Sequence, residues 1–298
     1  MKQITIFTPT YNRAYCLHQC YESLLRQTNK DFKWLIIDDG SNDNTKELIK
    51  SWIDEQIIEI IYHYQENQGM HGAHNTAYSL IDTELNVCID SDDFMPDNAV
   101  KDILGFWNKL SKSEKESVAG IVGLDADKNN NIIGNEIPPD ITKTTLYDLY
   151  EKHKIYGDKK LVYRTEIVNS YPNYPLFEGE RFVPLGYKYL LIDQDYELLT
   201  LNKPLCIVEY MLDGSSLNIF HQYKRHPKGF AFSRISEIQY GRTFSYRFKK
   251  AIHYVANNLM FGNFSYLKKA PRKLTVLLAT IPGVLLYLYI LIRTRKKK

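Results

Sequence analysis

Residues 85–93 read LNVCIDSDD, a nearly unbroken apolar run that ends in three carboxylates and a serine. A short run with apolar residues on both faces predicts a strand buried on both sides, as in a parallel sheet. Asp90, Asp92 and Asp93 follow at the point where this strand ends. The segment therefore predicts a buried strand that delivers an acidic loop to one edge of a sheet.

The residues on either side repeat a strand–helix alternation through about residue 125. This alternation predicts an α/β fold with a mostly parallel, Rossmann-like sheet covered by helices on both faces. Residues 126–215 are less regular, and residues 227–270 are helical, basic and rich in aromatics. The expected strands are Gln3–Thr8, Lys33–Asp38, Ile57–Tyr62, Leu85–Asp90 and Ala119–Leu124, and the expected helices are 15–27, 43–54, 71–81 and Pro96 to about Leu110.

Polar, turn-forming residues follow four of these strands. In open α/β sheets, ligands bind outside the carboxyl ends of the strands, so these four loops should gather around one site. They are Pro9–Arg13, Asp38–Ser41, Glu66–Gly69 and Asp90–Asp93.

The acidic loop has the composition of a metal site. Three carboxylates within four residues repel one another, and a divalent cation relieves that repulsion. Hard oxygen ligands suit Mg²⁺ or Mn²⁺, which bridge to a diphosphate. The alternative is an acidic loop that caps the helix opening at Pro96.

The other loops offer contacts for a nucleotide. Asp39, beside Asp38, has an acceptor for a base N–H, although Asp-Gly-Ser is also ordinary turn chemistry. Tyr11, after Thr10, would stack on a base, and Arg13 would meet a phosphate. Gly69 and Gly72 permit close backbone approach, and His71 or His74 is either a metal ligand or, more commonly, a surface or capping residue.

Bulk properties exclude several classes of protein. The 298-residue chain carries a net charge of only +3, which does not suggest nucleic acid. Its four cysteines form no CxxC pair, and Met1–Gln3 leads into a strand rather than an apolar leader, so we expect a reducing compartment. Walker A and G-x-G-x-x-G motifs are absent from the sequence, against an ATPase or a dehydrogenase.

Four motifs together resemble family 2 glycosyltransferases with the GT-A fold. They are Pro9–Arg13, Ile37–Ser41 followed by Asp43 and Thr45, Asn67-x-Gly69 with Ala73-x-Asn75, and Asp90-Ser91-Asp92-Asp93. The resemblance implies an inverting hexosyl or related transferase that takes a sugar from a UDP- or similar nucleotide sugar. It implies that Asp92, with Asp90 nearby, holds the metal, and that the donor is bound by Thr10, Tyr11, Arg13, Asp38, Asp39, Asn67, Gly69, Asn75, Asp90 and Ser91.

Inversion requires a general base for the acceptor hydroxyl. The family places this carboxylate in the second half of the catalytic domain, often as a Glu-Asp pair, and Glu180 is the nearest match here. Asp193 and Asp195 are rivals, and a plain surface role for Glu180 is the alternative. Because the Q-x-x-R-W motif of processive synthases is not matched, we expect one sugar per encounter. Val208–Leu217 (VEYMLDGSSL) resembles enzymes that build bacterial surface polysaccharides.

The carboxyl-terminal region predicts contact with a membrane. Leu274–Ile292 is nineteen residues without charge, flanked by basic residues on both sides. Positive charge marks the cytoplasmic side of membranes, and Pro282-Gly283 should kink the helix. We expect an in-plane or re-entrant anchor on the cytoplasmic side, beside a lipid-linked or polysaccharide acceptor, with a single span or a soluble core helix as alternatives.

The predicted domains are 1–218, a glycosyltransferase domain with a nucleotide-sugar half (1–125) and an acceptor half (126–218), and 219–298, a basic helical region. Two other functional classes stay open at this stage. A nucleotidyltransferase would also use an Asp pair and a metal, but usually has a glycine-rich, basic loop after the first strand. A non-catalytic nucleotide-sugar-binding subunit would not need the acid pair.

Overall fold

The computed structural model describes residues 2–209 and 219–295. Its contacts divide the chain into two compact units. The first unit is Met1–Gln68, Gly72–Asn173 and Asp195–Tyr210, and the second is Gly69–His71, Tyr174–Gln194 and Met211–Lys298. The predicted domains 1–218 and 219–298 remain a prediction. Most of the VEYMLDGSSL motif lies outside the described residues.

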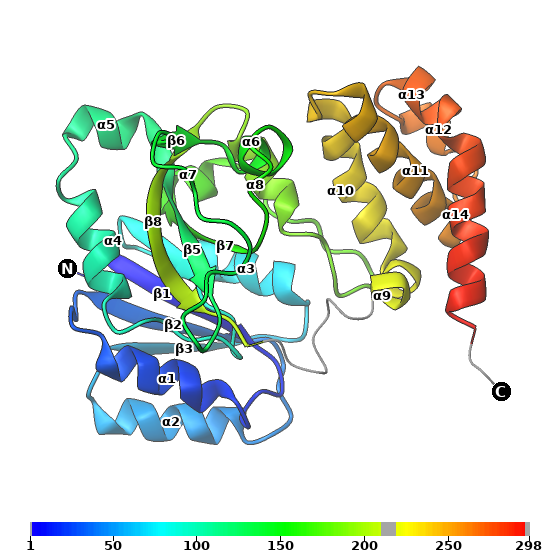
Figure 1. The fold of residues 1–298 in the computed structure, drawn as a ribbon. Coiled ribbons are helices and arrows are strands. Elements are labelled where there is room, and N and C mark those ends of the chain that lie inside the picture. Colours follow the sequence, from blue (N-terminus) through cyan, green and yellow to red (C-terminus); the bar gives the residue numbers. More distant parts are fainter. Residues whose placement is uncertain (1, 210–218, 296–298) are drawn as a thin grey trace. The chain divides into compact units, whose positions relative to one another are not determined.

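The first unit is built on one eight-stranded sheet of order β3-β2-β1-β4-β7-β5-β8-β6 (Figure 1). Strands β3, β2, β1 and β4 are parallel neighbours, as predicted. β7 lies antiparallel between β4 and β5, and β8 is parallel to β5. The strands are β1 Ile4–Thr10, β2 Phe32–Asp38, β3 Ile60–Tyr64, β4 Leu85–Cys88, β5 Val118–Ala126, β6 Lys143–Thr144, β7 Lys159–Arg164 and β8 Glu197–Ile207.

Helices cover both faces of the parallel half of the sheet. On one face, α1 (Leu17–Arg26), α2 (Thr45–Glu55) and α4 (Ala99–Trp107) bury apolar side chains against β1, β2 and β4. On the other face, α3 (Met70–Leu80) sets His74 and Tyr78 edge-on against Phe7. The two faces follow from the alternation of side chains along β1, where Ile4 and Ile6 point opposite to Phe7.

The five predicted strands and four predicted helices of the first unit are present close to their predicted bounds, whereas β6, β7 and β8 were not predicted. The largest shifts are in β3, which begins at Ile60 rather than Ile57, and in α4, which begins at Ala99 rather than Pro96. The Pro96 carbonyl accepts the Ala99 N–H in a turn that precedes α4. The remaining helices of this unit are short: α5 Lys112–Glu116, α6 Leu146–Glu151 and α7 Thr165–Ser170.

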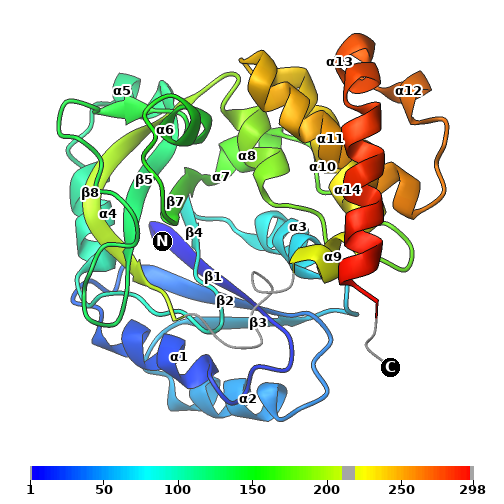
Figure 2. The same ribbon diagram turned by 45° about the vertical axis from the view of Figure 1, so that its right-hand side comes forward.

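The second unit is helical (Figure 2). It contains α8 Gly186–Ile192, α9 Ile219–Arg225, α10 Pro227–Tyr240, α11 Phe244–Met260, α12 Tyr266–Lys269, α13 Lys273–Leu278 and α14 Thr280–Arg293. α11 packs against both α10 and α14. The predicted interruption of the apolar segment is present: α13 ends before Ala279 and α14 begins after it, since Pro282 has no N–H to offer the Leu278 carbonyl. Across residues 2–209 and 219–295, no helix is both long and apolar enough to cross a membrane.

Candidate active site

The carboxyl ends of β1, β2, β3 and β4 meet at one edge of the sheet. Thr10 is in register with Asp38, and Asp38 with Tyr64. Phe7 is in register with Cys88, so the residues after β4 emerge beside those after β1. The structure therefore brings the Thr10, Asp38 and Asp90 loops of the first unit together, as the parallel sheet predicts.

The acidic loop after β4 holds its carboxylates in two different environments. Asp90 and Asp92 are half-buried, whereas Asp93 is buried. Asp93 accepts a hydrogen bond from the Cys206 Sγ–H at 3.6 Å and one from the Glu209 backbone N–H at 3.3 Å. Burial raises the pKa of Asp93 to about 7, although the nearby Lys160 opposes this shift. The loop thus keeps one acid inside the fold and the other two half-buried at the end of β4.

A cluster of charged groups behind this loop was missed by the sequence analysis. Burial opposes the charge on Lys160 of β7, but Cys206 and the carboxylates of Asp125, Asp93 and Asp90 outweigh it, so the pKa of Lys160 lies well above its usual value. Asp125 is buried, and its Oδ1 atom finds no hydrogen-bond partner within the described residues. The available signal was a lysine inside the strand sequence KKLVYR, where the sheet pleat forces alternate side chains inward.

Asp90 and Asp92 are the two carboxylates that would hold the predicted Mg²⁺ or Mn²⁺ ion, and their role as metal ligands remains a prediction. In the described part of the chain, no three His, Cys, Asp or Glu side chains converge on a point that would hold an ion unaided. Mg²⁺ sites commonly use only one or two carboxylates, with substrate phosphates and water completing the shell. The N-cap position of α4 is Asn98, so none of Asp90, Asp92 and Asp93 occupies it, as the capping alternative would require.

The carboxylates of Asp38 and Asp39, at the end of β2, form hydrogen bonds that connect neighbouring loops. Asp38 accepts the Ser41 N–H at 2.8 Å and the Tyr62 hydroxyl at 2.7 Å. Asp39 accepts Gln65 Nε2–H at 2.7 Å and the Gln68 N–H at 2.8 Å. These bonds fix the loops after β2 and β3, and the predicted contact of Asp39 with a base remains a prediction.

Gly40 lets the same two loops approach closely. It has a φ of +87°, and a Cβ atom there would lie 2.9 Å from the Asn67 backbone nitrogen. A side chain at this position would therefore push the Asn67 loop away from the β2 end.

The loop after β1 presents both a buried hydroxyl and an exposed ring. Thr10 is buried, and its Oγ1 atom has no hydrogen-bond partner among the described residues. Tyr11 is 46% exposed. Arg13 is half-buried, with its guanidinium 5.6 Å from the centroid of the Tyr15 ring. A buried hydroxyl with no hydrogen-bond partner and an exposed aromatic ring are both groups that a nucleotide could contact, and these contacts remain a prediction.

The two histidines of α3 are buried rather than superficial. His74 Nδ1 lies 3.2 Å from the Tyr78 hydroxyl, and its Nε2 lies 3.7 Å from Cys88 Sγ. This places His74 in the core beneath the sheet edge, with Asn75 half-buried beside it. His71 belongs to the second unit and is also buried.

Glu180 and Gly69 are described within the second unit. The two carboxylate oxygens of Glu180 accept the backbone N–H groups of Lys228 at 3.0 Å and Gly229 at 2.9 Å, at the start of α10. Gly69 has a φ of +80°, and a Cβ atom there would lie 1.9 Å from the Arg181 carbonyl oxygen. A glycine is thus needed at position 69 because the Arg181 backbone lies too close for a side chain, and the predicted contact of Gly69 with the donor is a separate matter.

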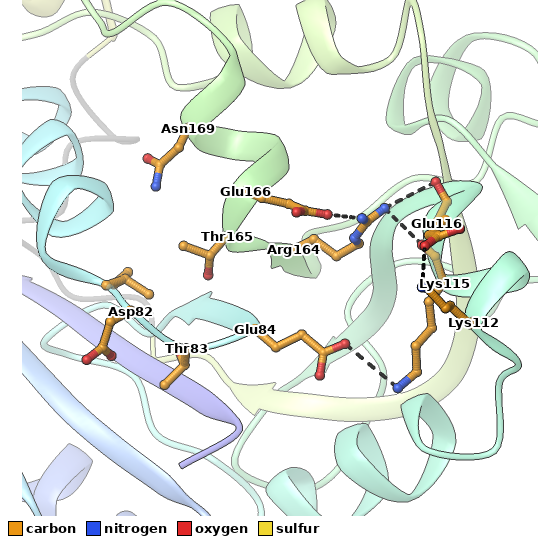
Figure 3. A pocket seen from close by; sticks show the side chains of 11 residues that line it. Asp82, Thr83, Glu84, Lys112, Lys115, Glu116, Arg164, Thr165, Glu166 and Asn169 are labelled. Atoms are coloured by element: carbon orange, nitrogen blue, oxygen red, sulfur yellow. Dashed lines mark hydrogen bonds and ion pairs between the residues drawn. The ribbon is translucent and has the colours of Figure 1, made fainter. Parts of the chain in front are cut away.

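A polar pocket lies at the amino end of β4, whereas the acidic loop follows its carboxyl end (Figure 3). It measures about 520 Å³ and is lined by side chains from Ile81–Glu84, α5 and residues 164–169. Arg164 pairs with Glu166 and donates to the Lys115 and Val118 carbonyls, and Lys115 lies 3.7 Å from Glu84. Because these charged side chains already pair with one another or with backbone carbonyls, the pocket gives no evidence for a bound ligand.

The family described as Glycosyl transferase family 2 matches residues 5–171, which hold the parallel half of the sheet and the acidic loop. The chain belongs to this family. It is therefore a glycosyltransferase that uses a nucleotide-sugar donor, and the nucleotidyltransferase and non-catalytic alternatives are set aside.

Among curated glycosyltransferases, the chain is 26% identical over 225 residues to UDP-Glc:alpha-D-GlcNAc-diphosphoundecaprenol beta-1,3-glucosyltransferase WfgD of Escherichia coli. The match covers 74% of this chain and 83% of that enzyme.

Solved glycosyltransferase structures share the predicted GT-A fold. TarS residues 1–349 of S. aureus, in complex with UDP-GlcNAc, superpose with a TM-score of 0.60 at 16% identity, over 97% of this chain and 81% of that one. The mannosyltransferase PcManGT of Pyrobaculum calidifontis, in complex with GDP-Man and Mn²⁺, gives 0.55 at 17% identity, over 98% and 83%.

Proposed function

We propose that this glycosyltransferase transfers one sugar, with inversion, from a UDP-sugar to a lipid-linked or polysaccharide acceptor, and that Asp90 and Asp92 hold Mn²⁺ or Mg²⁺. The observation that supports the proposal is the acidic loop, where Asp90 and Asp92 are half-buried at the end of β4 while Asp93 is hydrogen-bonded inside the fold. WfgD, by its name, takes UDP-Glc and acts on a diphosphoundecaprenol-linked sugar.

The residues of the chain would share the work of donor binding. Tyr11 would stack on the base, and Asp39 would accept a base N–H. Arg13 would approach the diphosphate, with Thr10, Asp38, Asn67, Gly69, Asn75 and Ser91 shaping the donor site. A bound divalent ion would supply positive charge to the departing diphosphate.

Glu180 is our proposed base. An ionised carboxylate has about four lone-pair positions, and two backbone N–H groups use part of this capacity in Glu180. Glu180 therefore keeps lone pairs that could accept a hydrogen bond from the hydroxyl of the acceptor substrate, while the start of α10 holds its carboxylate in place.

Kinetics of Glu180→Gln distinguish a base from a helix cap. Loss of a general base lowers kcat by roughly 10²–10⁴-fold with little change in UDP binding. Loss of a cap alone lowers the melting temperature and leaves kcat near the wild-type value. Asp193→Asn and Asp195→Asn are the matched comparisons. If kcat falls in one of these variants and not in Glu180→Gln, that aspartate rather than Glu180 is the base.

We also propose that the enzyme works at the cytoplasmic face of the cell membrane, as a peripheral or monotopic protein, and does not bind nucleic acid. The support is the acceptor class together with the basic, apolar carboxyl-terminal segment.

A panel of UDP-, GDP- and other nucleotide sugars tests the proposed donor and metal. Release of the free nucleotide is measured with Mn²⁺, with Mg²⁺ and with EDTA. We expect release from one UDP-sugar, dependent on the metal. Release that is equally fast in EDTA would contradict the metal, and release only from a GDP-sugar would contradict the donor.

A further inference from the structure

Helix α14 is apolar on two opposite faces, and the protein covers only one of them. Gly283 and Ile290 are buried, and they lie on the same side of the helix. Gly283 lets α14 approach α11 closely, since a Cβ atom there would lie 2.5 Å from Val255 Cβ. This inner face therefore belongs to the core of the second unit, beside α11 in Figure 2.

The opposite face is apolar and open to solvent. Its residues follow helical spacing from α13 into α14, and their exposed fractions run from 47% to 75%. We call this set the outer stripe: Leu277, Leu278, Ile281, Leu285, Leu288 and Ile292. An apolar helix surface of this continuity marks an interaction site rather than ordinary surface.

Positive charge flanks the outer stripe at both ends. Lys268, Lys269 and Lys273 are exposed at the α13 end, and Arg293 and Arg295 are exposed at the α14 end. In the sequence, no Asp or Glu follows Glu237. The region therefore combines an exposed apolar stripe with basic ends and no acid.

This charge distribution selects among the possible occupants of the stripe. Two copies packed stripe to stripe, parallel or antiparallel, would bring basic ends together, and like charges oppose such a dimer. A bilayer with anionic headgroups accepts both features at once, because the leucines enter the acyl boundary while the lysines and arginines remain among the headgroups.

We infer that the outer stripe is a membrane-docking face, on which α14 lies in the plane of an anionic phospholipid bilayer. This deepens the membrane part of the proposed function and does not depend on its catalytic part. With α14 held against α11 by its inner face, docking brings the whole second unit to the bilayer surface, where a lipid-linked acceptor resides.

Co-sedimentation of the full-length chain with sucrose-loaded vesicles tests the inference. Vesicles of equal parts phosphatidylcholine and phosphatidylglycerol are compared with phosphatidylcholine alone. The variants are Leu285→Glu, the double substitution Lys268→Ser with Lys269→Ser, and the control Ile57→Glu, whose side chain is 58% exposed in the first unit. Melting temperature and release of UDP from the donor are measured in parallel.

We expect wild type and Ile57→Glu to bind the anionic vesicles, and Leu285→Glu to bind at least about tenfold more weakly. The lysine variant should weaken binding to anionic vesicles selectively. The inference would be overturned if Leu285→Glu bound the anionic vesicles as strongly as wild type at an unchanged melting temperature. It would also be overturned if wild type formed a dimer without lipid and Leu285→Glu dissociated that dimer. If Leu285→Glu still releases UDP, the docking face is not needed for the reaction. If the wild-type chain binds vesicles but releases no UDP, that result would contradict only the catalytic part of the proposed function.

Discussion

The Sγ atom of Cys206 on β8 lies 3.6 Å from Oδ2 of Asp93 in the acidic loop. Cys206 is itself in register with Asp125 on β5. β8 thus holds Asp93, the buried acid of the loop that follows β4. With Asp93 held in this way, Asp90 and Asp92 are left at the edge where the donor is proposed to bind.

The charge of Lys160 should stabilise the buried carboxylates near it, since it lowers the pKa values of Asp93 and Asp125 against the effect of burial. Leaving a buried acid without a compensating partner costs about 1–3 kcal/mol. We expect Lys160→Met to lower the free energy of unfolding by about that amount, and by clearly less when Asp125→Asn is also present. Urea unfolding measures both values. Lys203→Met, which removes a largely exposed partner of Asp102, is the control and should cost about 1 kcal/mol or less. Additive effects of the Lys160 and Asp125 substitutions would contradict the coupling.

The sequence was sufficient for β1 to β5 and insufficient for β6, β7 and β8. β1, β2, β3 and β4 each carry their own apolar pattern and a polar loop, so local residues determine both the strand and its place at the edge. β7 enters between β4 and β5 through pairings such as Val87 with Val162, which depend on partners distant in sequence. The cluster around Lys160 was missed for the same reason.

The candidate site shows the same division. Asp90 and Asp92 could be located because they directly follow a recognisable strand. The capping contacts of Glu180 could not, because its partners Lys228 and Gly229 lie nearly fifty residues away in the sequence.

Two glycine-to-alanine substitutions should have opposite effects on stability. At Gly69, an added Cβ atom would lie 1.9 Å from the Arg181 carbonyl oxygen, and φ is +80°. We expect Gly69→Ala to destabilise the protein by about 2–4 kcal/mol. At Gly105 in α4, a Cβ atom would meet nothing within 4 Å, so Gly105→Ala should stabilise by about 0.5–1 kcal/mol. Thermal unfolding of both variants checks this, and equal melting temperatures would contradict the close approach at Gly69.

Acid should destabilise the second unit through His226. Burial lowers the pKa of His226 to about 4, with Arg225 and Arg181 adding to the effect, and its Nδ1 accepts the Arg181 N–H at 3.0 Å. An unfolded histidine titrates near 6.5. The folded-state pKa is depressed, so the unfolded chain binds the proton first, and stability is full above about pH 6.5 and lost as pH falls toward 4.

Between pH 7 and pH 5 this single group should cost about 2 kcal/mol. Burial also lowers the pKa values of His71 and His253 to about 4, so His226→Asn, which keeps an acceptor near the Nδ1 position, should reduce the fall in unfolding free energy over this range by about 2 kcal/mol without abolishing it. His221→Asn, at an exposed position on α9, should leave the fall unchanged. A wild-type stability that does not depend on pH over this range would contradict the prediction.

The metal role of the acidic loop is tested most directly by calorimetric titration of UDP into the protein, with and without Mn²⁺. For wild type, and for Asp97→Asn at the exposed acid paired with Arg26, Mn²⁺ should strengthen UDP binding by at least about tenfold, equivalent to about 1.4 kcal/mol. In Asp92→Asn the effect of Mn²⁺ should disappear while the melting temperature is unchanged. An Asp92→Asn protein whose UDP affinity still rises with Mn²⁺ as in wild type would contradict the assignment.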